Sequence, residues 1–545
     1  MPKEREDVET KSSDSPEVYQ QPKFMAWFEK AFPWLLVGGA ALGLVLMIFL
    51  PVIFFQEKTA EQLLAQSNLR LALLYTTGGA IAAFGLLETY RKNTNDRAKA
   101  NADINAALKN QEHQAEVLKE QIRQFDENAF KDRKAERRER YTKAVEQLGD
   151  EKAPIRMGGV YALVGLVDEW LEEKSLSDDE RFKEGQVIIN NLCAYIRSPF
   201  TLASHYDELS EDAPSLEGIY KDKKEEFYVD KAILDSEADV RLSIIKEIHD
   251  RIQGPDKNTP GAWSDFEYDF SGSTFFYPID LTNSYYAKPI NFSGSTYQAL
   301  AYFTDSTYQG WANFSSSTYQ ALAYFTDSTY QGWANFSSST YQGWANFSSS
   351  TYEGEANFSD STYEKDVTFS TPIFRSTYVG EANFSSSTYQ GWANFTDSTY
   401  QEGADFSRSI FYSETYFGKG KYSNSSSCFT NRAPQFYDKT NRKNTLFGSH
   451  NNDFTVDIDK GYPINLNSEG LPLDCKFLTS EQKEYLEGKF QEIEKINNEL
   501  LKVKDPEEKE ELSKKLQALH EELNKWREEV TTVKVEDIAA EDTES

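Results

Sequence analysis

Residues that could carry out catalysis or hold a metal are few and widely separated in this chain of 545 residues. The cysteines are Cys193, Cys428 and Cys475, which form no CxxC pair and no even-numbered disulfide framework, so the sequence predicts a reducing compartment. The five histidines do not have metal-ligand spacing. The HExxH, GxSxG and phosphate-binding glycine motifs of common enzymes are also absent. We therefore predict a non-enzymatic protein with no catalytic, cofactor-binding or metal-binding residues.

Acidic residues outnumber basic ones, 88 to 58, which gives a formal net charge of −30. This balance argues against binding to nucleic acid through its phosphates, because that mode of binding needs clustered lysine and arginine side chains. The length is too great for one compact core and predicts several domains.

Aromatic residues recur at a fixed interval through residues 266–428, where phenylalanines and tyrosines each return every 11 positions. Each Tyr follows a Phe after five positions, as Tyr297 follows Phe292, and steps of five and six do not fit a helix of about 3.6 residues per turn. A short fixed period indicates a stack of similar coils, each covering the next, with the rings inside. The predicted repeat core is Phe292, Tyr297, Phe303, Tyr308, Phe314, Tyr319, Phe325, Tyr330, Phe336, Tyr341, Phe347, Tyr352, Phe358, Phe384, Tyr389, Phe395, Tyr400 and Phe406.

The repeated segments A-N-F-S-S and S-T-Y-Q-G resemble pentapeptide repeats, a family whose fold is a right-handed quadrilateral β-helix. With one extra residue for every two pentapeptides, the 11-residue period predicts 22 residues per four-sided coil and about seven coils. Residues 295–316 and 317–338 are identical, as duplication of a whole coil would produce. Four extra residues around the segment TPIF, between Phe369 and Phe384, predict a bulge or loop. The resemblance implies a fold and leaves the activity open.

A second resemblance covers residues 140–170, which are similar to the helical segment of membrane-linked bacterial, especially actinobacterial, pentapeptide-repeat proteins. It implies a bacterial, membrane-anchored member of that family.

The residue that lengthens each pair of pentapeptides is often large and apolar. If these side chains point outward, they form an exposed apolar ladder, which is typical of a binding site. Packing between coils or against a flanking helix is the alternative, and the sequence leaves both open. The candidate interaction stripe is Leu300, Trp311, Leu322, Trp333, Trp344 and Trp392.

Two apolar runs near the N-terminus predict a transmembrane helical hairpin with a short external loop in residues 31–90. The first, from Pro33 to Phe55, is long enough to cross a bilayer without a charge, and the second covers residues 71–87. A buried soluble helix is the alternative for the second run. Lysine and arginine flank both outer ends, so the tail of residues 1–30 and everything after residue 90 should face the cytoplasm, from a bacterial inner (plasma) membrane.

A heptad seam in residues 91–140 predicts a coiled-coil stalk and a homo-oligomer, and a single amphipathic helix lying on its own domain is the alternative. The basic run at residues 131–140 fits either contact with anionic lipid or a solvated helix face. Residues 141–255 predict a helical, HEAT-like domain in which Arg156 and Arg241 hold adjacent helices together. The seam residues are Ile104, Leu108, Gln111, Ala115, Leu118, Ile122, Phe125 and Ala129.

The C-terminal part is predicted to contain an irregular cap or linker at residues 429–478 and a helical hairpin at residues 479–530. Thr479 and Gln482 are spaced to form a capping box at its start. The last residues, 531–545, are acidic and predicted to be disordered.

These features together predict a multidomain α and β protein that acts as a membrane-tethered interaction scaffold for an unknown protein partner. The alternative is a DNA mimic that protects a type II topoisomerase or another nucleic-acid-binding protein, as some pentapeptide-repeat proteins do. Against that alternative, charged side chains are sparse in the repeats and a membrane anchor suits a topoisomerase partner poorly.

Overall fold

The computed structural model divides the chain into two units, Met1–Ala129 and Phe130–Ser545, which are described separately. The predicted N-terminal tail up to residue 22, the TPIF segment and all but the first residues of the acidic tail lie outside the described residues. The structure describes residues 23–55, 59–215, 218–370, 375–418, 425–500, 503 and 506–533.

The first unit consists of helix α1 (Lys23–Phe54) and most of helix α2 (Ala60–Leu148). Both helices contain stretches long and apolar enough to cross a membrane, judged by length and composition. They approach closely at Gly43, where an added Cβ would lie 2.7 Å from the Thr77 side chain, and such small residues are common at contacts between membrane helices.

Helix α2 continues without interruption from the second apolar run into the heptad seam, because no proline or capping residue breaks it. The large seam side chains are exposed within this unit, with Leu118 at 58% and Phe125 at 73%. A single helix in water does not bury such a stripe on its own.

The second unit begins with a helical layer built from the end of α2 and the helices that follow. Ser177 and Glu180 form a reciprocal capping box at the start of α4, and α2 ends at Leu148 directly before Gly149. An added Cβ at Gly159 would lie 2.7 Å from the Ala144 carbonyl oxygen, so this glycine lets α2 and α3 cross closely. The helices are α3 (Ala153–Leu171), α4 (Asp178–Arg197), the 3-10 helix η1 (Thr201–His205), α5 (Tyr206–Leu209) and α6 (Lys224–Ile252).

The basic run of residues 131–140 pairs with this helical layer, which neither of the two sequence interpretations anticipated. The Arg137 guanidinium lies 2.9 Å from a Glu173 oxygen and stacks 4.7 Å from the Trp170 ring. Arg140 pairs with Glu169 on the same helix, α3. Glu173 is almost fully buried. Burial opposes its ionisation, but hydrogen bonds from Ser175, Arg133 and Arg137 hold its pKa at about 2. The run therefore joins α2 to its own domain.

Arg156 and Arg241 both contact Glu237, which confirms that these two arginines hold adjacent helices together. Arg241 is 1% exposed and donates to the Ile196 and Ser198 carbonyl oxygens at the end of α4, at 2.7 and 2.8 Å. These bonds satisfy carbonyl groups that lack a partner within the helix.

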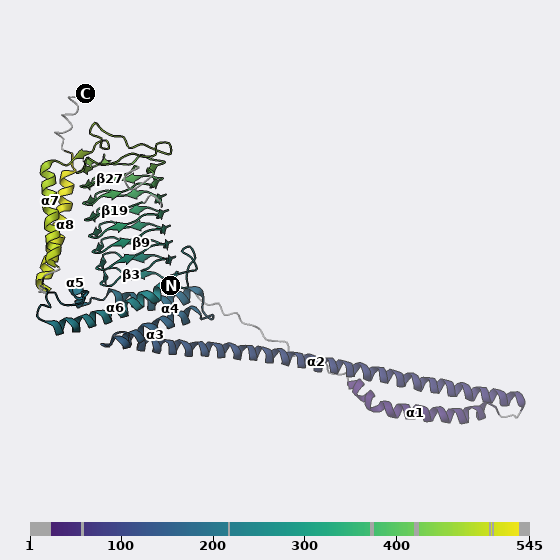
Figure 1. Ribbon diagram of the computed structural model, residues 1–545. Helices are drawn as coiled ribbons and strands as arrows, with labels where there is room; N and C mark the ends of the chain where they lie inside the picture. Colours follow the sequence, from purple (N-terminus) through teal and green to yellow (C-terminus); the bar gives the residue numbers. More distant parts are fainter. Residues whose placement is uncertain are drawn as a thin grey trace, which may run out of the picture. The chain divides into compact units, whose positions relative to one another are not determined.

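A parallel β-solenoid of about seven turns follows the helical layer (Figure 1). Its strands are two residues long and join four sheets in turn, here named A to D. Sheet A contains β1 (Tyr268–Asp269), β5 (Ile290–Asn291), β9 (Ala312–Asn313), β13 (Ala334–Asn335), β17 (Ala356–Asn357), β21 (Ala382–Asn383) and β25 (Ala404–Asp405). Sheet B contains β2 (Thr274–Phe275), β6 (Thr296–Tyr297), β10 (Thr318–Tyr319), β14 (Thr340–Tyr341), β18 (Thr362–Tyr363), β22 (Thr388–Tyr389), β26 (Ile410–Phe411), β31 (Leu446–Phe447) and β32 (Lys476–Phe477).

The other two large sheets have the same construction. Sheet C contains β3 (Ile279–Asp280), β7 (Ala301–Tyr302), β11 (Ala323–Tyr324), β15 (Ala345–Asn346), β19 (Val367–Thr368), β23 (Ala393–Asn394) and β27 (Thr415–Tyr416). Sheet D contains β4 (Tyr285–Tyr286), β8 (Thr307–Tyr308), β12 (Thr329–Tyr330), β16 (Thr351–Tyr352), β20 (Thr377–Tyr378), β24 (Thr399–Tyr400) and β28 (Cys428–Phe429). A separate antiparallel pair consists of β29 (Tyr437–Asp438) and β30 (Lys443–Asn444).

Buried serines connect successive turns of the solenoid. The backbone N–H of Ser317 donates to the hydroxyl of Ser339, 22 positions later, and the Ser317 hydroxyl donates to the Phe292 carbonyl oxygen. The same ladder runs along much of the rod and gives many buried serine hydroxyls a partner, whereas the hydroxyls of Ser273 and Ser398 have none among the described residues. The spacing becomes 26 between Ser361 and Ser387, across the four extra residues of the sequence, and returns to 22 between Ser387 and Ser409.

Sheet B continues beyond residue 428 into the segment expected to be an irregular cap. Strand β31 pairs with β26 and β32 pairs with β31, and the Phe411 and Phe447 rings stack 5.2 Å apart. Two-residue strands separated by long, non-repeating loops carry no periodic signal, which explains why the sequence pattern ended earlier.

Helices α7 (Ser480–Leu500) and α8 (Pro506–Val530) lie alongside the solenoid next to sheet B (Figure 1). Thr479 and Gln482 form the predicted capping box through reciprocal hydrogen bonds. An apolar cluster joins the two helices to the last turns of the solenoid, with Leu486 and Phe490 packed among Ile410, Leu446 and Leu478.

Candidate functional site

The predicted repeat-core residues all lie inside the solenoid, each at most 1% exposed. Rings of one sheet stack on the next turn, as Tyr297 does on Tyr319 at 4.5 Å between ring centroids. Rings that follow strands of sheets C and A meet edge to face, as Phe303 and Phe314 do at 5.1 Å. Aromatic pairs prefer both of these arrangements. These side chains form the core of the rod and leave its outer faces for binding.

Burial raises the pKa of the ladder tyrosines, such as Tyr319 and Tyr330, well above their ordinary value of about 10. The neutral phenol is therefore favoured in the folded state. Its contribution to stability is complete below the unfolded pKa and decreases as the pH rises past it.

Raising the pH beyond about 10 should consequently unfold the solenoid together with ionisation of its tyrosines. The measurement is a titration in which tyrosinate absorbance and the circular dichroism of the β-structure are followed in parallel. Ionisation of all 31 tyrosines near pH 10 with unchanged circular dichroism would contradict the buried ladder.

The candidate interaction stripe separates into two groups on different sheets. Trp311 and Trp333 each precede a strand of sheet A, whereas Leu300, Leu322, Trp344 and Trp392 precede strands of sheet C. A step of 11 residues advances the chain by two strands, so successive members of the series alternate between these sheets.

The two groups differ in exposure. Trp311 and Trp333 stack on each other at 5.5 Å between ring centroids and remain 39% and 40% exposed. Leu322 is 36% exposed, and the Trp344 ring packs edge to face on Tyr324 while its indole N–H donates to Thr368. Packing between turns and exposure to solvent are therefore both present, and the tryptophan pair of sheet A is the more exposed aromatic surface.

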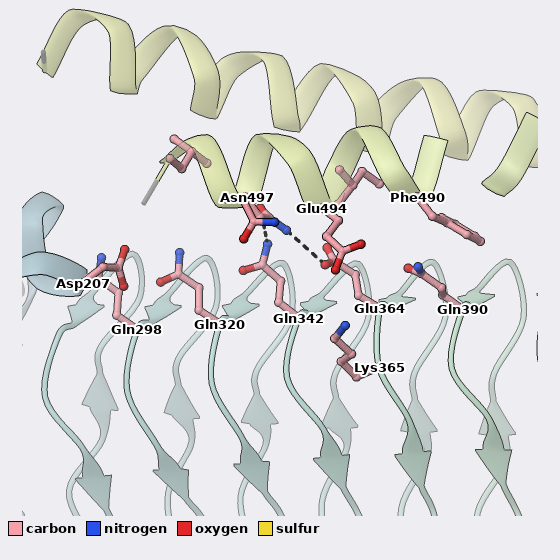
Figure 2. Close-up of a pocket in the computed structure, with 13 residues that line it drawn as sticks. Asp207, Gln298, Gln320, Gln342, Glu364, Lys365, Gln390, Phe490, Glu494 and Asn497 are labelled. Carbon is pink, nitrogen blue, oxygen red and sulfur yellow. Dashed lines mark hydrogen bonds between the residues drawn. The ribbon is translucent and has the colours of Figure 1, made fainter. Parts of the chain in front are cut away.

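A polar groove lies between α7 and the outer side of sheet B (Figure 2). Two cavities of about 320 and 650 Å³ share Asp207, Gln298, Gln320 and Leu500, and together they form this groove. We name it the glutamine groove, because a row of glutamines from successive turns lines it: Gln298, Gln320, Gln342 and Gln390.

Only part of the glutamine groove is closed by hydrogen bonds. Gln342 Nε2 donates to Asn497 Oδ1 at 3.3 Å, and Asn497 Nδ2 donates to Glu364 Oε2 at 3.4 Å. His520 Nε2 lies 3.3 Å from the other Glu364 oxygen. Gln298 Oε1, in contrast, is buried and has no hydrogen-bond partner among the described residues.

Charged groups lie at the end of the glutamine groove near η1 and α5. Burial raises the pKa of Asp207 and lowers the pKa of Lys509, and each charge partly offsets the effect on the other. Lys509 also donates to the Ser204 carbonyl oxygen. This end of the groove is therefore formed jointly by the helical layer and α8.

Sequence reasoning did not identify the glutamine groove. The S-T-Y-Q motif places glutamine on sheets B and D alike, and nothing local distinguishes Gln320, which lines the groove beside sheet B, from Gln331 on sheet D. A usable signal was the amphipathic pattern of residues 480–530, because an amphipathic helix needs another surface against which it can bury its apolar face.

Cys193, Cys428 and Cys475 are free and buried, and the described ranges contain no cluster of residues arranged to hold a metal ion. The chain matches no protein-family model, and no curated protein or solved structure matches it. The fold defines a β-solenoid protein with candidate membrane helices.

Proposed function

We propose that this chain is a membrane-anchored bacterial pentapeptide-repeat protein and serves as a non-enzymatic scaffold that presents its β-helical rod to a protein partner. The observation that carries this function is the stacked pair of Trp311 and Trp333, which leaves aromatic surface exposed on an otherwise polar rod. Exposed aromatic side chains are enriched where proteins bind each other.

The finer architecture belongs to the same proposal. The 22-residue spacing of the serine ladder supports a four-sided coil built from two 11-residue repeats. The 141–255 region would be HEAT-like and α7 with α8 would form the C-terminal helical hairpin. The exposed seam on α2, with Leu118 at 58%, supports a coiled-coil stalk that joins copies of the chain into a homo-oligomer.

The membrane part of the proposal has two spans in the bacterial inner membrane, with the N-terminus and the rod in the cytoplasm. The apolar stretches of α1 and α2 support it by length and composition. The excess of lysine and arginine at both outer ends supports this orientation.

Crosslinking in native membranes tests the scaffold directly. A photoreactive amino acid at Trp333 in the full-length chain should capture a specific protein from intact membranes, and mass spectrometry identifies it. The matched control carries the same amino acid at Gln331, two residues away and exposed on sheet D. The Trp311→Ser variant should abolish capture by the probe at Trp333 without a large change in melting temperature, because Trp311 forms the other half of the stacked pair.

Three results would count against the scaffold: equal capture at both positions, extraction of the chain by alkaline carbonate, and protection of the C-terminal region from protease in inverted vesicles. A topoisomerase or other nucleic-acid-binding protein captured at Trp333 would favour the DNA-mimic alternative.

A further inference from the structure

The glutamine groove contains a buried polar atom that has no hydrogen-bond partner among the described residues. Gln298 Oε1 is buried and lacks a partner among the described residues, although it lines both cavities. An unsatisfied buried acceptor is unfavourable, so the binding of a ligand that donates a hydrogen bond to Gln298 Oε1 is favoured. The combined groove has the size of a typical small-molecule site.

The carboxamides of Gln298, Gln320 and Gln342 repeat with the rise of the solenoid. Tyr297, Tyr319 and Tyr341 directly precede these glutamines, and successive ring centroids lie 4.5 and 4.8 Å apart. This distance is the rise from one turn of the solenoid to the next, here called one rung. An extended peptide advances about 3.3 Å per residue and falls out of step with these rungs. An extended β-1,4-linked sugar chain advances by nearly one rung per residue, and its hydroxyls both donate and accept, as carboxamides do.

The charges around the glutamine groove favour a neutral ligand. Glu364 and Glu494 lie beside Lys365, and Asp207 lies near Lys509 at the other end (Figure 2). A polyanion would meet the carboxylates and a polycation would meet the ammonium groups.

We propose that the glutamine groove binds a neutral, extended oligosaccharide, with successive sugar residues placed against the carboxamides of Gln298, Gln320 and Gln342. Carboxylates of Asp207 and Glu494 accept hydrogen bonds from sugar hydroxyls at the two ends. This site lies on sheet B and does not involve the tryptophans of sheet A, so it is independent of the scaffold proposal.

The test uses the full-length chain in lauryldimethylamine oxide, a detergent without a sugar headgroup, and measures binding of cellotriose and triacetylchitotriose by titration calorimetry. At least one of them should bind. Gln320→Leu should weaken that binding about fivefold or more, since it removes hydrogen bonds to the ligand. Gln331→Leu, with the same substitution in the same motif on sheet D, should leave the affinity unchanged.

Gln298→Leu provides a second variant in case Gln320→Leu folds poorly, which circular dichroism reveals. Absence of binding by either saccharide at millimolar concentration overturns the proposal. Equal weakening by Gln320→Leu and Gln331→Leu overturns it as well, and so does binding of spermidine in place of the saccharides. None of these results depends on membrane topology or on a protein partner.

Discussion

Replacing Phe336 by alanine should lower the free energy of unfolding of the solenoid by about 3–5 kcal/mol, the largest effect expected from a single core substitution. Phe336 is fully buried. Its ring stacks on Phe314 at 5.1 Å and on Phe358 at 5.0 Å, and it meets Phe325 and Phe347 edge to face. Alanine would leave a cavity in the middle of the rod, where neighbouring turns cannot close without breaking their register.

The measurement is the urea midpoint of the full-length chain, followed by circular dichroism. Gln331→Ala is the matched control, because Gln331 is exposed on the same turn and its loss should change stability by less than about 0.5 kcal/mol. Phe336→Leu should fall between them, since it removes fewer buried atoms. Equal midpoints for Phe336→Ala and Gln331→Ala would show that the ring ladder does not stabilise the rod.

Replacing Arg241 by alanine should destabilise the helical layer by about 3–5 kcal/mol, because it leaves Glu237 buried with a weaker set of partners. Glu237 is 6% exposed and, among the described residues, would retain Arg156 and the Tyr195 hydroxyl as partners. The carbonyl oxygens of Ile196 and Ser198 would also lose their donor.

Arg432→Ala is the control for this prediction. Arg432 lies 2.9 Å from Glu381, and Arg241 lies 2.8 Å from Glu237, so the two ion pairs are alike in geometry. The side chains of Arg432 and Glu381 are both 62% exposed, and solvent screening reduces such a pair to about 1 kcal/mol or less. Thermal unfolding of both variants compares them. Similar melting temperatures would mean that burial does not set the strength of the Glu237 network.

Local and repeating features were predictable from the sequence. The alternation of Phe and Tyr identified the inward positions of the solenoid, because every turn repeats the same local environment. Residue types also identified the start of a helix, at the Thr479–Gln482 capping box before α7. The matching positions of Arg156 and Arg241 indicated their shared structural role.

Relations between distant segments were not predictable in this way. The basic run of residues 131–140 was interpreted as a surface feature, yet Arg137 pairs with Glu173, which lies just after α3. Sheet B gained β31 and β32 from a segment without a repeat. The sequence grouped the residues of the candidate stripe into one series, and only the structure showed that they are divided between sheets A and C.

The sequence alone therefore determined the repeating core of this protein, the apolar stretches of α1 and α2, and the scarcity of residues suited to catalysis. Only the tertiary structure decided which outer faces are covered. Gln320 and Gln331 belong to the same S-T-Y-Q motif and both are exposed, but Gln320 lines the groove beside α7, whereas Gln331 lies on sheet D. The contact that marks this difference joins Gln342 to Asn497 across 155 positions, and no local pattern encodes a contact at that separation.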